Sequence, residues 1–310
     1  MRLRDFGALL LLAAIFGGSF LFIRVAAPAL GPVTLADVRV LVAGLALLLY
    51  GVLGVRKRMN LRAYWKRYLI LGALNAALPY SLIGFAELRL TAGLAAILNA
   101  TTPLFATVVA AFWLGDRITP AKLFGLLLGI IGVSVVVGWS PLALDGGVAL
   151  AVAASLLAAL AYALGGVYAK RTFVGVAPLA QATGQQLGAG IVLLPFAIPL
   201  TIGAAPTLHL SPDVIGAVVA LALLGTALAY LIYFYLIVTV GATSTLSVTF
   251  LVPFFGLLWS ALFLHEPVSV GSILGLLIIL ASIVLVTGLS LRPPTRRQRV
   301  ALETAAPHQQ

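Results

Sequence analysis

The chain of 310 residues is 62% hydrophobic and 9% charged, and it carries a formal net charge of +11. Soluble domains contain about 25% charged residues, and a soluble protein of this length could not bury so much apolar surface. The composition therefore excludes a soluble fold and indicates lipid as the solvent. The basic residues lie in short segments between apolar runs, which favours contact with anionic lipid headgroups over contact with nucleic acid.

Ten apolar runs of about 20 residues, the length that crosses a bilayer as a helix, follow one another along the chain. We predict membrane spans at about 6–26, 34–54, 68–88, 91–114, 120–139, 147–169, 178–201, 212–237, 241–264 and 270–290. The first run has a basic start and a small-residue end, so a cleaved signal peptide is an alternative to a retained helix. Its match to a later span, Phe16 with Tyr162 and Arg24 with Lys170, favours the retained helix.

The basic residues also predict the orientation, because they concentrate on the cytoplasmic side of a membrane. With the N-terminus inside, 16 of the 19 Lys and Arg residues lie in cytoplasmic segments, and only Arg24, Arg39 and Arg89 lie outside or near the outer surface. We therefore expect a multi-pass protein of the bacterial inner (plasma) membrane with both termini cytoplasmic. Residues 292–310 are expected to form a disordered cytoplasmic tail.

The stretch 90–136 occurs twice, because residues 240–286 align with it without a gap at an offset of 150. The aligned pairs include a proline, an acidic residue and a glycine: Pro103 with Pro253, Asp116 with Glu266, and Gly125 with Gly275. Similarities outside this stretch extend the repeat to five helices in each half, at 1–145 and 146–291. Because five is odd, the second copy enters the membrane from the opposite side.

We therefore predict an all-α integral membrane fold with ten transmembrane helices built from two inverted five-helix repeats. Inverted repeats are the architecture of secondary transporters, whose substrate site lies near the middle of the membrane between the halves. Only three histidines are present, and the chain has no cysteine and no HExxH or GxSxG motif, so an intramembrane enzyme is a remote alternative. No cofactor and no metal are expected.

Two ordered sets of motifs stand in register in the two halves. They are Arg39, Ala92 with Pro103, Leu114-Gly115-Asp116 and Gly125 with Gly132 in the first half, and Ala242, Pro253, Leu264-His265-Glu266 and Gly275 in the second. These motifs resemble the EamA-type repeat of the drug/metabolite transporter superfamily. The acidic turn of the family usually reads Gly-Glu, so both turns depart slightly from it. The resemblance covers about residues 6–290 and implies ten helices that export amino acids, metabolites or drugs. In overall similarity the chain resembles the bacterial exporters of aromatic amino acids.

Two prolines are expected to kink equivalent helices. Pro103 and Pro253 lack an amide hydrogen, so each frees a carbonyl four residues earlier, at Asn99 and Thr249. An unpaired carbonyl is costly in lipid, so these kinks should face protein or a wet cavity. Packing against a neighbouring helix is the alternative to lining a cavity.

Tyrosines and amides provide the remaining candidate contacts. Thr226, Tyr230 and Tyr233 share one face of a helix, although tyrosines in membrane proteins also form interfacial belts or simply pack. Arg39 lies about five residues into the second span, where its guanidinium could bind a substrate carboxylate or extend to the outer surface. We expect the substrate to contact Asn75, Tyr80, Asn99, Thr102, Tyr162, Gln185, Tyr230, Tyr233, Thr245, Thr249 and Arg39.

The acidic residues lie near helix ends or turns. Asp116 and Glu266 precede Thr119 and Ser269, which we predict to be helix N-caps, so both acids are expected to be structural caps, with gating as the alternative. No carboxylate lies deep in a span, so facilitated export or exchange is at least as credible as proton antiport.

These features predict a secondary transporter that exports small amphipathic metabolites, most of all amino acids and aromatic ones in particular, by alternating access around a central cavity. A passive pore or facilitator is the alternative. The expected partners are the small-molecule substrate and membrane lipids, with no nucleic acid. The glycine ridge Gly125, Gly129 and Gly132 favours packing inside a monomer, and a homodimer is the alternative.

Overall fold

The computed structural model describes residues 3–55, 59, 61–140, 142, 145–205, 210–241, 244–245 and 247–288. The described residues form helices and connecting turns and contain no strand. Nine helical segments among them are long and apolar enough to cross a membrane, and Val248–Leu264 is a shorter apolar helix. The predicted all-helical fold with ten spans is confirmed. The predicted tail, 292–310, lies outside the described residues.

Several spans are built from more than one helical segment. In the first half the elements are α1 (Leu3–Leu30), α2 (Pro32–Leu49), η1 (Tyr50–Gly54), η2 (Leu61–Tyr64), α3 (Trp65–Gly72), η3 (Ala73–Ala77), α4 (Leu78–Ala86), α5 (Ala92–Asn99), α6 (Thr102–Leu114) and α7 (Pro120–Gly138). In the second half they are α8 (Gly146–Thr172), α9 (Pro178–Ala204), α10 (Pro212–Ala222), η5 (Leu223–Leu228), α11 (Ala229–Val240), α13 (Val248–Leu264) and α14 (Val270–Thr287). The segments η1, η3 and η5 are π-helical.

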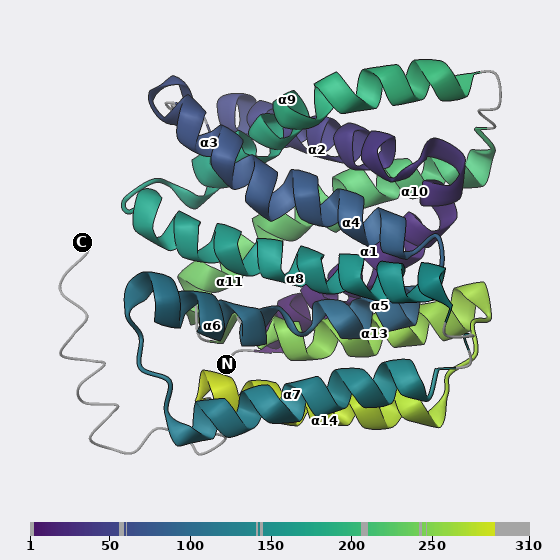
Figure 1. Ribbon diagram of the computed structural model, residues 1–310. Helices are drawn as coiled ribbons and strands as arrows, with labels where there is room; N and C mark the ends of the chain where they lie inside the picture. Colours follow the sequence, from purple (N-terminus) through teal and green to yellow (C-terminus); the bar gives the residue numbers. More distant parts are fainter. Residues whose placement is uncertain are drawn as a thin grey trace.

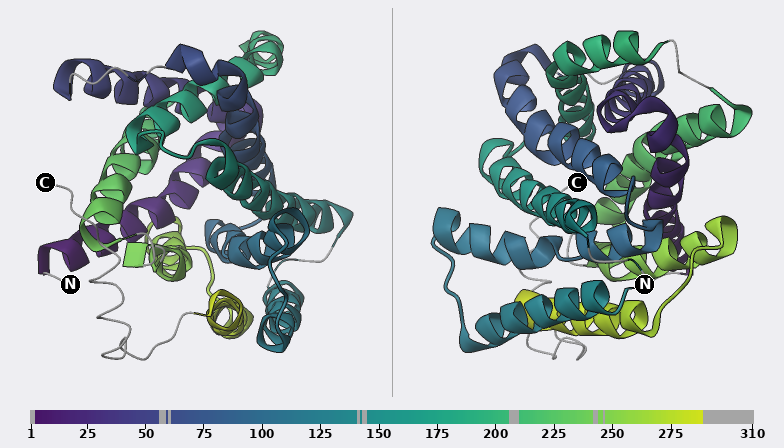
Figure 2. Two further views of the ribbon diagram at one scale, coloured as in Figure 1. Left: turned by 90° about the vertical axis from the view of Figure 1, so that its left-hand side faces the viewer. Right: turned by 45° about the vertical axis from the view of Figure 1, so that its right-hand side comes forward.

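The helices run side by side across Figure 1, so the bundle has a left-hand and a right-hand end in that view. The connections α4–α5, α9–α10 and α13–α14 lie at the right-hand end, and α6–α7 and α8–α9 lie at the left-hand end. The pair α7 and α14 forms one edge of the bundle, and α9 lies at the opposite edge (Figure 2). This alternation places corresponding connections of the two halves at opposite ends.

The pair α7 and α14 packs closely because both helices present glycine to the contact. A methyl group on Gly275 would lie 2.9 Å from the carbonyl oxygen of Gly132 and would also collide with the side chain of Val136. A methyl group on Gly125, the repeat partner of Gly275, would lie 3.0 Å from the carbonyl oxygen of Ser282. The glycine ridge of α7 therefore packs within the chain, where small residues let helix backbones approach.

Replacing Gly275 with alanine is expected to destabilise the protein by about 1–3 kcal/mol, the usual cost of overpacking a filled interface. The matched control is Gly216→Ala on α10, where an added methyl group meets no atom within 4 Å. The control should leave stability unchanged or raise it slightly, because alanine favours a helix over glycine by about 1 kcal/mol. Thermal unfolding of the two purified variants checks this, and equal shifts would contradict the packing account.

Candidate functional site

A group of polar side chains meets where the two halves face each other. We call it the central polar cluster, and it consists of Arg39, Asn75, Tyr80, Tyr162, Gln185, Thr226 and Tyr230. The first three residues come from α2, η3 and α4 of the first half, and the others come from α8, α9, η5 and α11 of the second half. The cluster therefore lies where an inverted-repeat transporter is expected to hold its substrate.

Arg39 is the charged member of the cluster. Its side chain is only 6% exposed, and its Nε atom donates a hydrogen bond to the Thr226 hydroxyl at 2.9 Å. The guanidinium carbon lies 3.7 Å from the centre of the Tyr80 ring, close enough for a cation–π interaction. Arg39 thus points into the bundle and does not extend to the membrane surface. In the described part of the chain it forms no ion pair.

An amide chain links the two halves beside Arg39. The Asn75 Nδ2 atom donates to Gln185 Oε1 at 2.9 Å, and Gln185 Nε2 donates to the Tyr230 hydroxyl at 2.9 Å. Gln185 is buried, while Asn75 and Tyr230 are partly exposed. Because all three side chains are polar and hydrogen-bonded inside an apolar bundle, their positions are strongly restricted.

Tyr162 adds an aromatic edge to the cluster. The Tyr80 and Tyr162 rings meet edge to face with centres 6.3 Å apart. Gly165, one turn further along α8, lets this helix approach η3, because a methyl group there would lie 2.8 Å from the Asn75 Cβ atom. The small residue thus supports the contact between Tyr162 and the first half.

Two π-helical turns position parts of this cluster. Shifting residues 73–77 of η3 by the repeat offset of 150 gives 223–227, which lies inside η5. Asn75 lies in the first turn and Thr226 in the second, so both halves widen the helix at the same place. π-helical turns are rare and are frequent at functional sites. Their matched positions are a structural signal that apolar periodicity in the sequence does not reveal.

The first proline region lies apart from these contacts. The chain leaves the α-helical path between Asn99 and Thr102, so α5 and α6 are separate segments. The Thr102 hydroxyl donates to the Asn99 carbonyl oxygen at 2.7 Å and so satisfies the carbonyl that Pro103 leaves free. The Asn99 side-chain oxygen is buried and has no hydrogen-bond partner in the part of the chain that the structure describes. Thr102 therefore supports the helix break, and the part of Asn99 in binding stays a prediction.

The equivalent region of the second half differs. Pro253 lies inside the continuous helix α13, with Thr249 one turn before it. Thr245 is buried, and its hydroxyl donates to the Gly241 carbonyl oxygen at 2.9 Å. The Tyr233 ring contacts Phe234, with ring centres 6.0 Å apart. Phe234 also contacts the Tyr230 ring, with centres 5.8 Å apart, so Tyr233 lies next to the central polar cluster.

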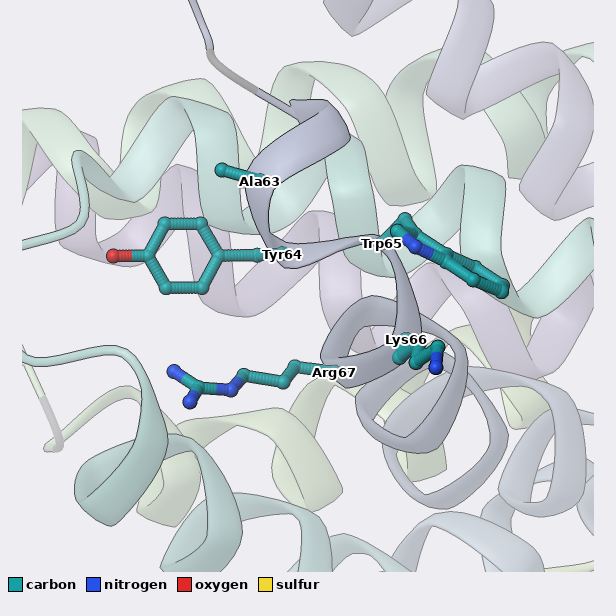
Figure 3. Close-up of a pocket in the computed structure, with 5 residues that line it drawn as sticks. All are labelled: Ala63, Tyr64, Trp65, Lys66 and Arg67. Carbon is teal, nitrogen blue, oxygen red and sulfur yellow. The ribbon is translucent and has the colours of Figure 1, made fainter.

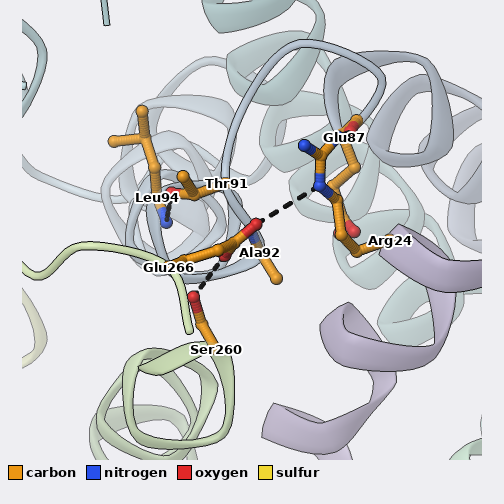
Figure 4. Close-up of polar contacts among 7 residues, drawn as sticks. All are labelled: Arg24, Glu87, Thr91, Ala92, Leu94, Ser260 and Glu266. Carbon is orange, nitrogen blue, oxygen red and sulfur yellow. Dashed lines mark hydrogen bonds and ion pairs between the residues drawn. The ribbon is translucent and has the colours of Figure 1, made fainter. Parts of the chain in front are cut away.

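A second polar cluster lies at the connections α4–α5 and α13–α14, which are at the right-hand end of Figure 1, and Figure 4 shows its contacts. The Glu266 Oε1 atom pairs with Arg24 Nε at 3.2 Å, and Oε2 accepts a hydrogen bond from the Ala92 amide at 2.9 Å. The Ser260 hydroxyl also donates to Oε2. Arg24 in addition donates to the backbone carbonyl of Glu87. We call Arg24, Glu87 and Glu266 the end cluster.

The end cluster shows which helix Glu266 caps. Thr119 and Ser269 are N-caps as predicted, accepting from the amides of Lys122 and Ser272. Glu266, however, caps α5 of the other half instead of the helix that follows it, because its carboxylate reaches the Ala92 amide. Arg24 forms an ion pair with Glu266 and so joins α1 to the connection between α13 and α14.

The equivalent residues at the left-hand end are arranged differently. Asp116, the repeat partner of Glu266, is exposed, and so is Lys170, the partner of Arg24. They form no ion pair with each other within the described residues. The end cluster thus joins the halves at the right-hand end, and other contacts join them elsewhere: the Tyr235 hydroxyl donates to Asp5, and Arg171 donates to the Trp113 carbonyl oxygen.

A shallow pocket of about 440 Å³ lies on η2 and the start of α3 (Figure 3). Its walls are Ala63, Tyr64, Trp65, Lys66 and Arg67. Trp65 is 55% exposed, and the Lys66 amine lies 5.5 Å from the centre of its ring. Exposed tryptophan with basic neighbours is typical of a segment at the lipid headgroups. This pocket does not include any residue of the central polar cluster.

The ten-span bundle, its inverted halves and the buried polar cluster between them define a membrane transporter. The sequence matches the EamA-like transporter family over residues 6–138 and again over residues 149–288, and the chain belongs to that family. It is 31% identical over 256 residues to the uncharacterized transporter YvbV of Bacillus subtilis, covering 82% of each chain. It is 30% identical over 294 residues to the uncharacterized inner membrane transporter YedA of Escherichia coli K12, covering 93% of each.

A solved crystal structure has the same fold, with a TM-score of 0.63 and 20% sequence identity. The similarity covers 93% of this chain and 98% of the other one. The family and these relatives therefore establish a multi-pass membrane transporter that acts on a small molecule.

Proposed function

We propose that this transporter exports small amphipathic metabolites that carry a carboxylate and an aromatic ring, with aromatic amino acids as the favoured substrates. The single observation that carries this proposal is the buried Arg39 guanidinium, which has no carboxylate partner in the described part of the chain. A buried charge without a counter-ion is costly, and a substrate carboxylate would supply that counter-ion.

The geometry around Arg39 suits a carboxylate. Its Nε atom is engaged by Thr226, and no hydrogen bond from its two terminal nitrogens is seen among the described residues. The guanidinium fork therefore has donors left for two parallel hydrogen bonds to a carboxylate. The Tyr80 ring fixes the plane of the guanidinium from one side.

The neighbouring side chains suit an aromatic ring. Tyr162 on α8 and Tyr230 on α11 are partly exposed and offer both ring surfaces and hydroxyls. Gln185 holds the Tyr230 hydroxyl and could exchange this bond for one to a polar group of the substrate. Apolar and aromatic walls with a few placed polar groups are the usual composition of a small-molecule site.

We propose that the halves move by alternating access, because equivalent residues of the two halves are paired at one end of the bundle and not at the other within the described residues. The end cluster ties the halves together at the right-hand end, while Asp116 and Lys170 at the other end are exposed and unpaired with each other in the described part of the chain. With the orientation that the basic residues predict, the right-hand end is the outer one. The structure is then a state closed to the outside, and rocking of the halves would open that end.

Transport by the purified protein in liposomes tests this function. Labelled L-tryptophan, L-tyrosine and L-phenylalanine should enter vesicles preloaded with the same unlabelled solute, with saturation and mutual competition. Labelled tryptamine, which lacks the carboxylate, should enter more slowly. Flux that never saturates would indicate a pore, and no flux of any carboxylated aromatic solute would overturn the proposed substrate class.

A further inference from the structure

Glu87, directly after α4, is the most deeply buried carboxyl group of the end cluster. Its side chain is 0% exposed, and neither carboxyl oxygen has a hydrogen-bond partner among the described residues. The Arg24 guanidinium lies beside it but donates to the Glu87 backbone carbonyl and pairs with Glu266. Figure 4 shows this arrangement, in which the ion pair uses the other acid of the cluster.

An ionised Glu87 would be unfavourable in this position. One arginine already balances one glutamate in the end cluster, so a second carboxylate would add a negative charge away from water that no arginine of this cluster balances. Burial raises the pKa of the Glu87 carboxyl well above its ordinary value of 4.5, Arg24 lowers it, Glu266 raises it, and Arg39 on α2 lowers it. The effect of burial is the largest of these.

From this geometry we propose that Glu87 is a proton-binding site whose occupancy is linked to the closure of the right-hand end of the bundle. In the closed state the carboxyl group holds its proton. When the halves separate at the end cluster, water reaches Glu87, the proton leaves to that water, and the carboxylate stays hydrated. Proton binding itself does not depend on the proposed substrate, whereas its use as a coupling ion rests on the proposed transport function.

The sign of the pH dependence follows from linkage. The closed state binds the proton more tightly than the open state, so the stabilisation of closure is full below the ordinary pKa of 4.5. It is lost as the pH rises through the raised pKa of the closed state. A higher pH therefore favours opening of the right-hand end, and a lower pH favours closure.

Infrared titration of the purified protein tests the proton site without a substrate. A protonated carboxyl group has its own carbonyl stretching band, which should persist at neutral pH in the unaltered protein and be absent from Glu87→Gln. Asp116→Asn, which changes an exposed acid, and Asp37→Asn, which changes another buried one, should retain the Glu87 band. Absence of the band from the unaltered protein at neutral pH, or its persistence in Glu87→Gln, would overturn the proposal.

A labelling experiment tests the link to closure. The chain has no cysteine, so a single Leu90→Cys, at a 0% exposed position beside Glu87, reports opening by its reaction with a maleimide. Leu210→Cys, on the 50% exposed Leu210, provides the reference rate at each pH. The ratio of the two rates should rise about tenfold or more from about pH 5 to about pH 8.

In the Glu87→Gln background the same ratio should stay low at every pH, because the amide resembles the protonated acid. A low ratio also shows that this variant is folded and closed. An equal rise with pH in both backgrounds, or no rise in either, would overturn the link between the proton and closure. Neither result would affect the substrate proposal, which the liposome transport measurement decides separately.

Discussion

Replacing Arg39 with glutamine is expected to lower the apparent affinity of the reconstituted transporter for L-tryptophan about 100-fold. Removing one partner of a buried, hydrogen-bonded charge pair costs roughly 2–5 kcal/mol, and 1.4 kcal/mol corresponds to tenfold in affinity. Arg39→Lys should also weaken binding strongly, because lysine keeps the charge but loses the planar fork and the stacking on Tyr80. Concentration dependence of uptake into liposomes measures both effects.

Two controls separate loss of carboxylate recognition from general damage. Arg89→Gln removes an exposed arginine at the right-hand end and should leave L-tryptophan uptake unchanged. Competition by tryptamine, which has no carboxylate, should be similar in the unaltered protein and in Arg39→Gln. Unchanged L-tryptophan affinity in a folded Arg39→Gln variant would show that Arg39 does not bind the substrate carboxylate. Another group would then have to bind it.

Replacing Glu266 with alanine is expected to shift the closed–open equilibrium toward opening of the right-hand end by about 30-fold. The change removes the ion pair with Arg24, whose side chain is 32% exposed, so this loss counts for about 1 kcal/mol. It also removes the acceptor of the Ala92 amide at the start of α5, an effect of about 1 kcal/mol by comparison with helix caps. Together these losses amount to about 2 kcal/mol, which corresponds to the expected shift of about 30-fold in the closed–open equilibrium.

The Leu90→Cys reporter measures this shift as a faster reaction with maleimide at a pH where the unaltered protein is closed. Asp116→Ala is the matched control, since Asp116 is the repeat partner of Glu266 but is exposed at the other end. It should leave the labelling rate of Leu90→Cys unchanged. If Glu266→Ala and Asp116→Ala had the same effect, the end cluster would not hold the outer end closed.

Much of the fold was predictable because lipid makes each span satisfy its own backbone hydrogen bonds and remain apolar for a fixed length. Hydropathy alone therefore located the helices, and the gapless repeat identified Gly125 and Gly275 as equivalent positions. Both lie in the contact between α7 and α14. A structural repeat that is also a sequence repeat can be predicted from the sequence alone.

The central polar cluster was predictable only in part. Tyr80, Tyr162, Gln185 and Tyr230 are polar side chains inside apolar spans, and burial requires partners for them, so a meeting point was a sound expectation. The direction in which Arg39 points was open, because a residue about five positions from a helix end reaches either the surface or the interior. Its partner Thr226 lies 187 positions away and could not be inferred from local sequence.

The end cluster illustrates what sequence patterns leave out. Glu87 and Glu266 follow helix ends, where carboxylates are usually hydrated or cap the next helix, so their positions suggested ordinary roles. Burial of Glu87 arises from the packing of α1 and the connection between α13 and α14 around α4. The acids near helix ends are therefore at the expected positions, but the environment of Glu87 makes it a candidate for proton coupling that the sequence did not indicate.

A structure of the protein with L-tryptophan bound would show whether Arg39 recognises the substrate carboxylate. We expect the ligand carboxylate within hydrogen-bonding distance of the Arg39 guanidinium, with the indole ring against Tyr162 or Tyr230. A ligand bound between the halves with its carboxylate away from Arg39, or bound outside the central polar cluster altogether, would overturn the proposed role of Arg39.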